Sequence, residues 1–299
     1  MLDQASQLRK LMWCSVREPP SDPARGPRVV VLSGGKGGVG VTTLAVHLSV
    51  ALAYRSVPVV LVDANLYRAD VAALCGVTER GSVADVLAAR REIHEVLVRG
   101  PAGVLVLPGL WAPGTPAEYT AAAQERLLRQ FQTLGPHAQV VVLDAGNGGS
   151  AVVRRFWAAA DDVLLVTTPD AVSVMDSYAT IKCLATREQR PPLQLLVNQA
   201  EGPHVVEDVH RRIDMSCQRF LGFGVGICGG VPPDAGLRAG GGWLAAGEAP
   251  TGSAAAAVAR LAAALLAEHA TRTPRRAVPP PHSPEPRAGQ ENAQPQQTY

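Results

Sequence analysis

The stretch Ser33-Gly34-Gly35-Lys36-Gly37-Gly38-Val39-Gly40-Val41-Thr42-Thr43 decides how this chain folds. It follows an apolar, β-branched run and precedes a helical pattern, which is the strand–loop–helix context of a phosphate-binding loop. Gly35, Gly40 and Thr42 fit the pattern G-x-x-x-x-G-K-[ST], but Val41 occupies the position of the lysine. We therefore predict a nucleotide cradle that has lost the side chain that normally reaches the β- and γ-phosphates.

Each residue type in this loop has a physical use in phosphate binding. Glycines let backbone N–H groups approach phosphate closely, and the N-terminus of the following helix adds partial positive charge. The hydroxyl of Thr42 is predicted to bind Mg²⁺. A glycine-rich turn that binds no ligand is the alternative. The predicted nucleotide-binding residues of the loop are Gly35, Lys36, Gly37, Gly38, Val39, Gly40, Val41, Thr42 and Thr43.

Short apolar runs alternate with helical patterns along the chain. The runs are 28–32, 58–62, 103–107, 139–143, 162–166, 193–197 and 224–228, and the helical patterns lie near 42–55, 82–98, 117–134, 150–160, 171–187, 203–220 and 254–270. The runs are apolar on both faces, as expected of buried parallel strands. This rhythm predicts an α/β protein of the P-loop NTPase fold, with a mostly parallel, twisted sheet of about seven to eight strands and helices on both faces.

Composition and charge narrow the functional class. The 299 residues are 47% hydrophobic and carry a formal net charge of +2, so we expect a large core and no partnership with nucleic acid. The apolar runs are far shorter than the roughly 18 residues that span a bilayer, and a signal-peptide core is missing, so we expect a cytoplasmic protein. The five cysteines form no C-x-x-C pair and are expected to be free thiols.

Changes in composition divide the chain into four expected parts. Residues 1–15 form a short N-terminal helix, and residues 16–27 form a linker rich in Pro, Arg and Asp. The nucleotide-binding domain covers 28–271. The tail, 272–299, is rich in proline, glutamine and charge and is expected to be disordered, because it cannot bury enough apolar surface to fold.

The loop resembles that of the MinD/ParA family of deviant P-loop ATPases, which reads K-G-G-x-G-K-[ST]-[ST]. The run from Lys36 to Thr43 matches seven of these eight positions. The resemblance implies that the site binds ATP or ADP with Mg²⁺ and that the chain forms an ATP-dependent homodimer. It also implies a catalytic role for Lys36, which would reach across the dimer to the phosphates of the partner copy.

Two acidic strand ends resemble further motifs of the family. The family's D-x-D motif is present as Asp63 and Asn65, and its D-x-x-x-G switch segment as Asp144 and Gly148. The resemblance places Asp63 and Asp144 near Mg²⁺ and gives Asn65 and Asp144 catalytic positions. Because an amide cannot accept a proton, Asn65 can hold a water but cannot act as a general base. Ordinary turns after strands are the alternative for both segments.

Two later segments resemble the elements of the family that recognise the base. Asn198 follows an apolar run, and Pro232 lies in the stretch Gly230-Val231-Pro232-Pro233-Asp234. The resemblance implies that Asn198 contacts an adenine edge and that Pro232 lies beside it. Simple loop structure is the alternative for each.

Two stretches point to the flagellar-number regulators FlhG, FleN and YlxH within the family. Residues 166–182 are similar to their T-T-P-E-x-x-x-x-x-D-A-Y-x-x-I-K stretch, and Asp3-Gln4-Ala5-Ser6-Gln7-Leu8-Arg9 matches their D-Q-A-x-x-L-R segment. The resemblance implies that an FlhF-type GTPase is the partner of this segment. The implied partner-binding residues are Asp3, Gln4, Ala5, Leu8 and Arg9.

The helical pattern over 258–269, with Leu261, Leu265 and Leu266, has two interpretations. In the family a C-terminal amphipathic helix attaches the protein to the inner face of the plasma membrane. Interfacial helices carry bulky apolar residues opposite Lys and Arg, whereas this one is rich in alanine and poor in cations. Packing in the core or in a dimer is the other interpretation.

Val41 and Asn65 together predict slow or absent ATP hydrolysis, with nucleotide binding that is weakened but retained through Mg²⁺, backbone amides and Lys36. Losing one preorganised donor typically costs about 10²–10³ in rate. Losing a group that positions or deprotonates water costs a further factor of roughly 10²–10⁴, although such factors need not multiply. We expect a nucleotide-binding regulator of flagellar placement and number. The alternative is an active ParA/MinD-type ATPase that positions the septum, the chromosome or other cargo.

Overall fold

The computed structural model describes residues 26–65, 68–109, 120–135, 137–184, 193–234 and 251–271, with side chains to residue 268. Three expectations from the sequence lie outside this range. They are the helix over 1–15 with its partner-binding residues, all but the end of the linker, and the tail 272–299. The nucleotide loop, both acidic strand ends, Asn198 and Pro232 lie inside it.

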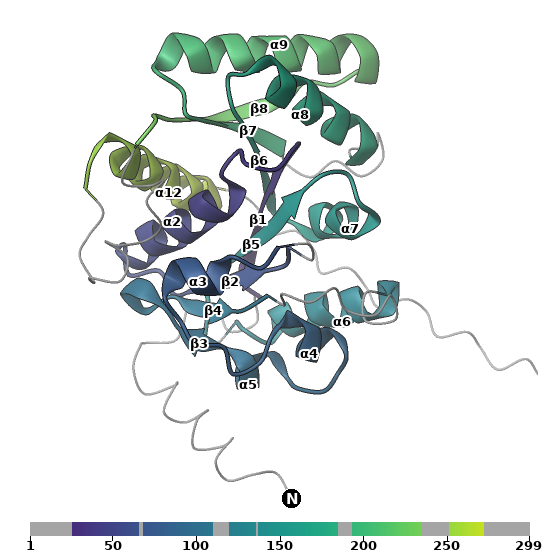
Figure 1. Cartoon of the computed structure of the whole chain (residues 1–299), viewed down its shortest axis with the longest axis vertical. Helices are drawn as coiled ribbons and strands as arrows, with labels where there is room; N and C mark the ends of the chain where they lie inside the picture. The colour runs from purple at the N-terminus through teal and green to yellow at the C-terminus, as the bar shows by residue number, and fades with distance from the viewer. Residues whose placement is uncertain are drawn as a thin grey trace, which may run out of the picture.

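The described strands form one eight-stranded sheet in the order β3-β4-β2-β5-β1-β6-β7-β8. All neighbours are parallel except β3 and β4 (Figure 1). The α/β prediction, with a mostly parallel sheet, is confirmed. The strands are β1 (Arg28–Gly34), β2 (Val59–Asp63), β3 (Val98–Arg99), β4 (Leu105–Leu107), β5 (Val140–Asn147), β6 (Asp162–Thr167), β7 (Leu193–Asn198) and β8 (Gly226–Val231).

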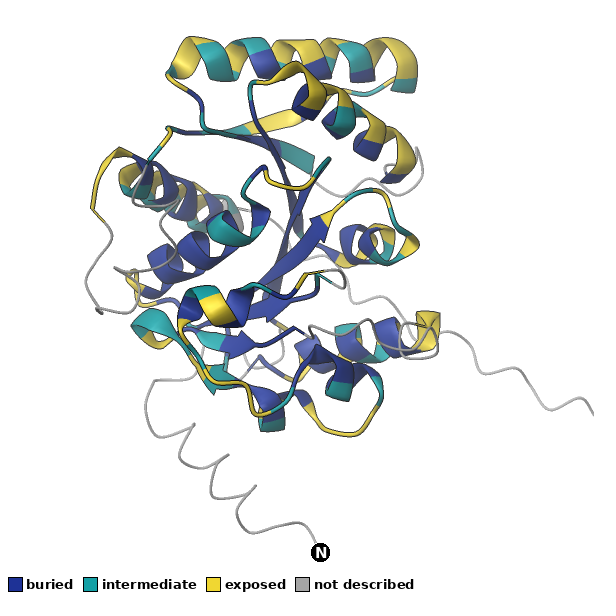
Figure 2. Ribbon diagram, viewed as in Figure 1, coloured by how far each residue is buried: buried dark blue, intermediate teal, exposed yellow. Residues whose placement is uncertain are grey.

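Successive side chains of each strand enter two separate cores. In β1, Val29 and Val31 pack on one side of the sheet, and Val30 and Leu32 pack on the other. This alternation follows from the two-residue period of a strand, and both faces are apolar because helices cover both. Figure 2 shows the central strands as a continuous buried layer beneath the partly exposed helices.

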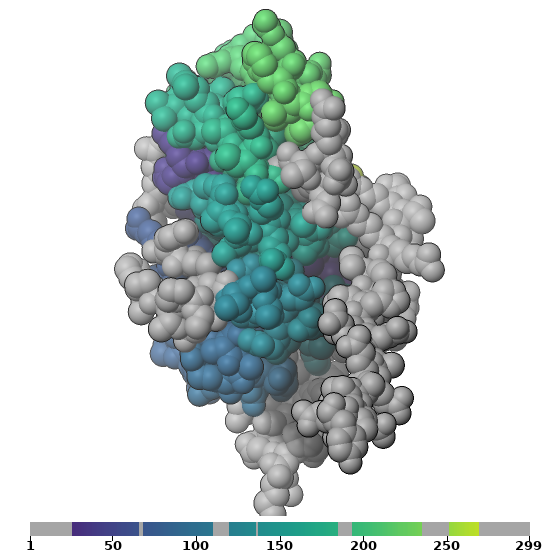
Figure 3. Space-filling model, turned by 90° about the vertical axis from the view of Figure 1, so that its right-hand side faces the viewer, coloured from purple at the N-terminus to yellow at the C-terminus, as the bar shows by residue number. Residues whose placement is uncertain are grey.

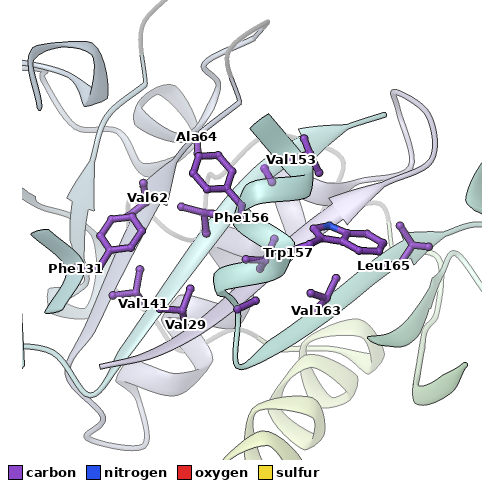
Figure 4. Packing of buried hydrophobic residues seen from close by; sticks show 14 of the residues in the cluster. Val29, Val62, Ala64, Phe131, Val141, Val153, Phe156, Trp157, Val163 and Leu165 are labelled. Carbon is purple, nitrogen blue, oxygen red and sulfur yellow. The ribbon is translucent and has the colours of Figure 1, made fainter. Parts of the chain in front are cut away.

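One core lies under α2 (Val41–Ala53), α3 (Val71–Cys75) and α12 (Ser253–Thr271). The other lies under α4 (Val83–Leu87), α5 (Ile93–Val96), α6 (Ala121–Gln132), α7 (Ala151–Ala159), α8 (Ala171–Leu184) and α9 (Pro203–Leu221). Phe131, Phe156 and Trp157 are its bulky aromatic residues, and they lie against the strand valines (Figure 4). In the view of Figure 3, α9 lies at one end of the molecule and the region of α4 to α6 lies at the other.

The prediction of one helix over 82–98 is wrong. The segment contains α4, α5 and the start of β3, and Ala89 between the helices has a φ of 57°. Each short helix has its own N-terminal capping box. The carboxylate of Asp85 accepts a hydrogen bond from the Ser82 N–H, and the carboxylate of Glu95 accepts one from the Glu92 N–H. Each capping box marks the start of a helix, and the two lie ten residues apart. They therefore divide the segment into two helices, although its hydrophobic pattern predicts one. The five-residue helix α3 and the antiparallel strand β3 were also missed.

The core interpretation of the C-terminal helix agrees with the structure. Leu261 and Leu265 of α12 are buried in the core that this helix shares with α2. Figure 1 shows α2 and α12 side by side on one face of the sheet. The apolar side of α12 is thus in contact with the protein interior. Within the described residues, every helix is too short or too polar to cross a membrane.

Replacing Leu265 by alanine should lower the free energy of unfolding by about 2–4 kcal/mol, because it removes a fully packed side chain and leaves a cavity. Leu266→Ala is the matched control, since Leu266 only borders the core, and should cost less than half as much. Urea denaturation of both variants measures the difference. Equal losses would contradict the placement of α12 on α2.

Candidate functional site

The glycine-rich loop follows β1, where the order of the strands in the sheet changes direction. From β1 the chain continues to β2 on one side of the sheet, and from β5 it continues to β6 on the other side. β1 pairs with β5 on one side and with β6 on the other. The connections after β1 and β5 therefore diverge at the carboxyl edge of the sheet, which is where open α/β sheets bind ligands. The loop, the two acidic strand ends and the turns after β6 and β7 all lie along this edge.

The loop between β1 and α2 depends on left-handed glycines. Gly38 and Gly40 have φ angles of 84° and 96°, which residues with a Cβ rarely adopt. Gly40 is the N-cap of α2, offers no side chain to the helix, and is followed by a first turn without acidic residues. The N-terminal N–H groups and the helix dipole at this point favour an anion. The loop therefore has the backbone geometry of a phosphate cradle, and the binding of nucleotide by it stays a prediction.

Val41 is part of the core and not of the phosphate-facing surface. Its side chain is buried together with Val39 and Leu44. A Cβ placed on Gly34 would lie only 2.9 Å from Val41 Cγ2, so this valine packs closely against the end of β1. The position that supplies a lysine in other phosphate-binding loops is thus occupied by an apolar contact.

Asn198, the last residue of β7, stabilises the loop through a side-chain hydrogen bond. Its amide Nδ2 donates a hydrogen bond to the Val39 carbonyl at 2.8 Å, and its Oδ1 accepts one from the Gln199 N–H at 3.0 Å. A Cβ on Gly40 would lie 2.4 Å from Nδ2, which explains why glycine is needed there. Pro232 follows β8, whose last residue is the register partner of Asn198. Both residues are therefore at the predicted edge, while their contact with adenine stays a prediction.

Asp63 and Asp144 are register partners on β2 and β5, and both are fully buried. Asp63 accepts hydrogen bonds from the N–H groups of Asn65 and Val71, each at 3.2 Å. Asp144 Oδ1 accepts one from Gly146 N–H at 2.9 Å, whereas Oδ2 has no partner among the described residues. A buried carboxylate oxygen without a partner is costly unless a cation compensates it.

Burial is the main cause that raises the pKa of both carboxyls. It raises the pKa of Asp144 to about 6, against the opposing effects of the Thr42 hydroxyl and the Gly146 N–H. For Asp63, burial and then the charge of Asp144 raise the pKa well above its usual value. Two adjacent acids that resist ionisation suit a divalent cation, whose charge would favour the ionised forms.

These residues fit Mg²⁺. Magnesium typically keeps several waters and uses only one or two carboxylates together with phosphate oxygens. Thr42 at the start of α2, Asp144 with its unpartnered oxygen, and Asp63 beside it supply that set of oxygen donors. The described residues contain no group of three or more His, Cys, Asp or Glu arranged as a metal cage. A hydrated ion shared with a nucleotide is the arrangement that these residues would hold.

Asn65 lies against the switch segment. A Cβ on Gly146 would lie 2.7 Å from Asn65 Cγ, and Gly146 has a φ of 67°. The Gly148 N–H donates to the Gly34 carbonyl at 2.9 Å, so this segment also contacts the start of the loop. The structure thus brings together Asn65, the switch segment and the loop, while their catalytic roles stay a prediction.

Lys36 forms an ion pair with Asp170, a residue that the sequence did not identify as part of the site. Its Nζ lies 3.3 Å from Asp170 Oδ1, in the turn between β6 and α8. This turn, the loop and the segment after β7 surround a cavity of about 430 Å³. The signal was present in Thr167-Thr168-Pro169-Asp170, which served only to indicate a branch of the family. Neither the hydrophobic period nor the loop motif indicates that this turn faces Lys36.

Comparison with known proteins gives the same family from several directions. A family model described as ParA, NUBPL iron-transfer P-loop NTPase, matches residues 27–198. The antiactivator FleN of Pseudomonas aeruginosa is 32% identical over 211 residues, which cover 71% of this chain and 75% of FleN. The chain belongs to the ParA/MinD family of P-loop NTPases. The resemblance inferred from the loop is therefore confirmed.

Other members show how the family relates to this chain. The flagellum site-determining protein YlxH of Helicobacter pylori is 27% identical, over 71% of this chain and 72% of YlxH. The crystal structure of the cell division ATPase MinD of Pyrococcus furiosus has a TM-score of 0.64 at 23% identity and covers 81% of this chain and 99% of MinD. MinD of Pyrococcus horikoshii, solved with Mg-ADP, has the same TM-score. These structural matches confirm the fold.

Asp144→Asn should increase stability, and the increase should depend on pH. Because the folded chain raises the pKa of Asp144 from 3.8 to about 6, it binds this proton more tightly than the unfolded chain does. The free energy of unfolding then falls as pH rises through that window, by up to about 3 kcal/mol from this group. The isosteric variant removes this loss.

The measurement is urea denaturation of wild type and Asp144→Asn from pH 4 to 7.5 without Mg²⁺. The stability difference should be small at pH 4, grow through the window and become constant above it. Taking the difference cancels the titrating groups that do not interact with Asp144. Asp63 adds to the difference in the same direction, because the charge of Asp144 raises its pKa and the variant removes that charge. A difference that does not change with pH would contradict the raised pKa.

Proposed function

We propose that this chain is a nucleotide-binding regulator of flagellar placement and number. The flagellum site-determining protein YlxH and the antiactivator FleN are each similar to it over 71% of its length. The observation that carries the proposal is the formed phosphate cradle and acid pair in a chain whose lysine and second-acid positions hold Val41 and Asn65. Such a site is suited to holding ATP or ADP with Mg²⁺ more than to hydrolysing it.

Weak hydrolysis follows from the charges around the cradle. Phosphoryl transfer relies on positioning and on neutralising charge, not on covalent help from the protein. Val41 provides an apolar contact where a cation would stabilise the transferring phosphoryl group, and Asn65 cannot accept the proton of an attacking water. Backbone N–H groups, Mg²⁺ and Lys36 are left to bind the phosphates.

Introducing a cation and an acid should restore catalysis. The double variant Val41→Lys/Asn65→Asp should hydrolyse Mg-ATP at least about 100-fold faster than wild type, because it returns a preorganised cation and a group that orients and deprotonates water. Val41→Met/Asn65→Asp is the matched control, since methionine has similar length without charge. Release of inorganic phosphate measures both. Fast turnover by wild type that Lys36→Ala abolishes would contradict weak hydrolysis.

The proposed partner is an FlhF-type GTPase, bound through the segment from Asp3 to Arg9. In a helix Ala5, Leu8 and Met12 would share one face, which is the pattern of a short amphipathic helix that docks on a protein groove. Gln4 would then be available to order a water or a switch loop of the GTPase. The linker over 16–27 would let this segment reach its partner while 28–271 binds nucleotide.

Gln4→Ala should remove the stimulation of GTP hydrolysis by this protein. The assay mixes each variant with the purified GTPase and measures GTP turnover without nucleotide in the regulator, with ADP and with ATP. Gln7→Ala is the matched control, because it changes the same residue type at a position that the motif leaves open. Absence of stimulation by wild type under all three conditions would remove the proposed partner mechanism.

Two further features belong to this proposal. An ATP-dependent homodimer would place Lys36 near the phosphates of the partner copy, and MinD of Aquifex aeolicus, which shares the fold, has been solved in a MinC:MinD complex. We also propose a cytoplasmic protein with peripheral contact to the inner face of the plasma membrane. Nucleic acid is not proposed as a partner.

The similarity to MinD of Bacillus subtilis, 30% identical over 57% of this chain, keeps an active positioning ATPase as the second candidate.

A further inference from the structure

A buried hydrogen bond joins helix α7 to the strand that carries the glycine-rich loop. The indole N–H of Trp157 donates to the Ser33 hydroxyl at 2.9 Å, although 124 positions separate the two residues in the sequence. Only 1% of Trp157 and none of Ser33 is exposed. Ser33 directly precedes Gly34, the last residue of β1, so the bond reaches this strand at the point where the loop begins.

Ser33 interrupts the apolar pattern of its strand. Val29 and Val31 point into the core beneath α7, and the two-residue period of β1 brings Ser33 to the same face. A hydroxyl in an apolar core is costly unless it has a hydrogen-bond partner, and so is the N–H of a buried indole. The bond gives each group a partner. In Figure 4 the indole ring of Trp157 extends from α7 toward Leu165, the register partner of Ser33 in β6.

The far end of α7 is also fixed on β1 by the residues that follow the helix. Asp161 donates its N–H to the Val29 carbonyl at 2.9 Å, and its Oδ2 accepts a hydrogen bond from the Val29 N–H at 2.8 Å. Helical side chains lean toward the N-terminus of their helix, so Trp157 extends back along α7 to Ser33. The second half of α7 is thus attached to β1 at two places, Val29 and Ser33.

The segment that leads into α7 has fewer contacts of this kind. It contains Gly146 and Gly148, whose φ angles are 67° and 84°, and Asn147 between them is exposed. A Cβ placed on Gly148 would meet no atom within 4 Å. The Gly148 N–H donates to the Gly34 carbonyl at 2.9 Å, which ties the segment to the end of β1. A fixed helix therefore follows a segment whose glycines have room to change conformation.

This segment affects the site because it orients a carboxylate. The Gly146 N–H donates to Asp144 Oδ1 at 2.9 Å, and Asp144 Oδ2 is the buried oxygen without a partner among the described residues. Asp144 would hold a hydrated Mg²⁺ together with Thr42. Because the Gly146 N–H holds one oxygen, the position of Gly146 determines how the carboxylate is oriented.

We propose that Trp157 is a positioning residue of the nucleotide site, which anchors α7 on Ser33 and thereby fixes the segment that orients Asp144 for Mg²⁺. The proposal rests on the proposed nucleotide-binding function. When Mg-nucleotide binds, rearrangement is confined to residues 145–150, because the helix behind them is held at Ser33 and at Val29. The hydrogen bond of Trp157 stays intact in both states, since breaking it would leave two buried polar groups without partners.

The anchor is tested without nucleotide, by hydrogen exchange measured with mass spectrometry. Ser33→Ala removes the acceptor with little change in volume, and Trp157→Phe removes the donor while an aromatic ring remains. Each should make the peptide over 144–150 exchange about fivefold faster, because losing one buried hydrogen bond shifts the local opening equilibrium by about that factor. The double variant should exchange like each single variant, since the two side chains form one bond.

Two controls separate the anchor from a general loss of stability. Phe131→Leu removes volume from the same core on a different helix, α6, and breaks no hydrogen bond of a side chain. It should lower the midpoint of urea denaturation without changing the exchange of 144–150. The peptide over α9, 203–221, is the internal control and should exchange equally in all the variants.

The effect on the site is measured by calorimetry with ADP, once in the presence of Mg²⁺ and once in EDTA. Ser33→Ala and Trp157→Phe should bind Mg-ADP about fivefold more weakly than wild type, the factor expected for one hydrogen bond. Their affinity for ADP in EDTA should equal that of wild type, because the backbone N–H groups of the loop remain in place. Phe131→Leu should match wild type under both conditions.

The outcomes distinguish the anchor, the positioning role and the nucleotide function. Unchanged exchange of 144–150 in both single variants overturns the anchor, regardless of the binding data. Equal losses of ADP affinity with and without Mg²⁺, or the same loss in Phe131→Leu, overturn the positioning role, because a loosened core then explains them. Absence of ADP binding by wild type under both conditions overturns the proposed nucleotide function, and hydrogen exchange still decides whether Trp157 anchors α7.

Discussion

The pairing of β1 with both β5 and β6 is the constraint on which the rest of the structure depends. A central parallel strand covered by helices on both faces is buried on both sides, and all residues of β1 are buried. Because β1 is central, the loop that follows it leaves the sheet between two neighbouring strand ends. The acid pair, the switch segment and the turn before α8 are placed around the loop by this pairing and not by their own sequences.

Buried charged side chains lie at both edges of the sheet, but their pairing differs between the two edges. At the amino edge, Arg28 and Asp162 form a buried ion pair at 2.5 Å, and Arg28 also donates to the Leu265 carbonyl of α12. At the carboxyl edge, Asp63 and Asp144 are equally buried, but Asp144 Oδ2 has no partner among the described residues. Isolated buried carboxylates are unfavourable. The fold thus compensates charge where it needs only stability, and at the site leaves a carboxylate that a cation would stabilise.

Val41, Asn65 and Asp170 have the same proposed effect, which is to weaken catalysis at the nucleotide site. Val41 joins the core, so the loop loses a cation. Asn65 packs on the switch segment as an amide, which cannot accept a proton from water. Asp170 holds the remaining cation of the loop in an ion pair. In the function proposed above, all three features would weaken the hydrolysis of a bound nucleotide, while the backbone cradle is unaffected. A domain of this kind is suited to adopting a nucleotide-dependent state and keeping it, which is the property that a regulator needs.

The sequence by itself determined the fold class, the loop and its missing lysine, because these depend on local patterns: alternating apolar runs, glycines at fixed spacing and one residue at position 41. It also indicated the acid strand ends, since parallel strands bring their carboxyl ends to one edge. It could not separate α4 from α5, because two capping boxes overrode one hydrophobic period. The tertiary structure alone decided that α12 packs on α2, that Asn198 bonds to the Val39 carbonyl and that Lys36 pairs with Asp170. The last two contacts join residues 159 and 134 positions apart, and such pairs follow only from the strand order, which a single sequence does not encode in any local signal.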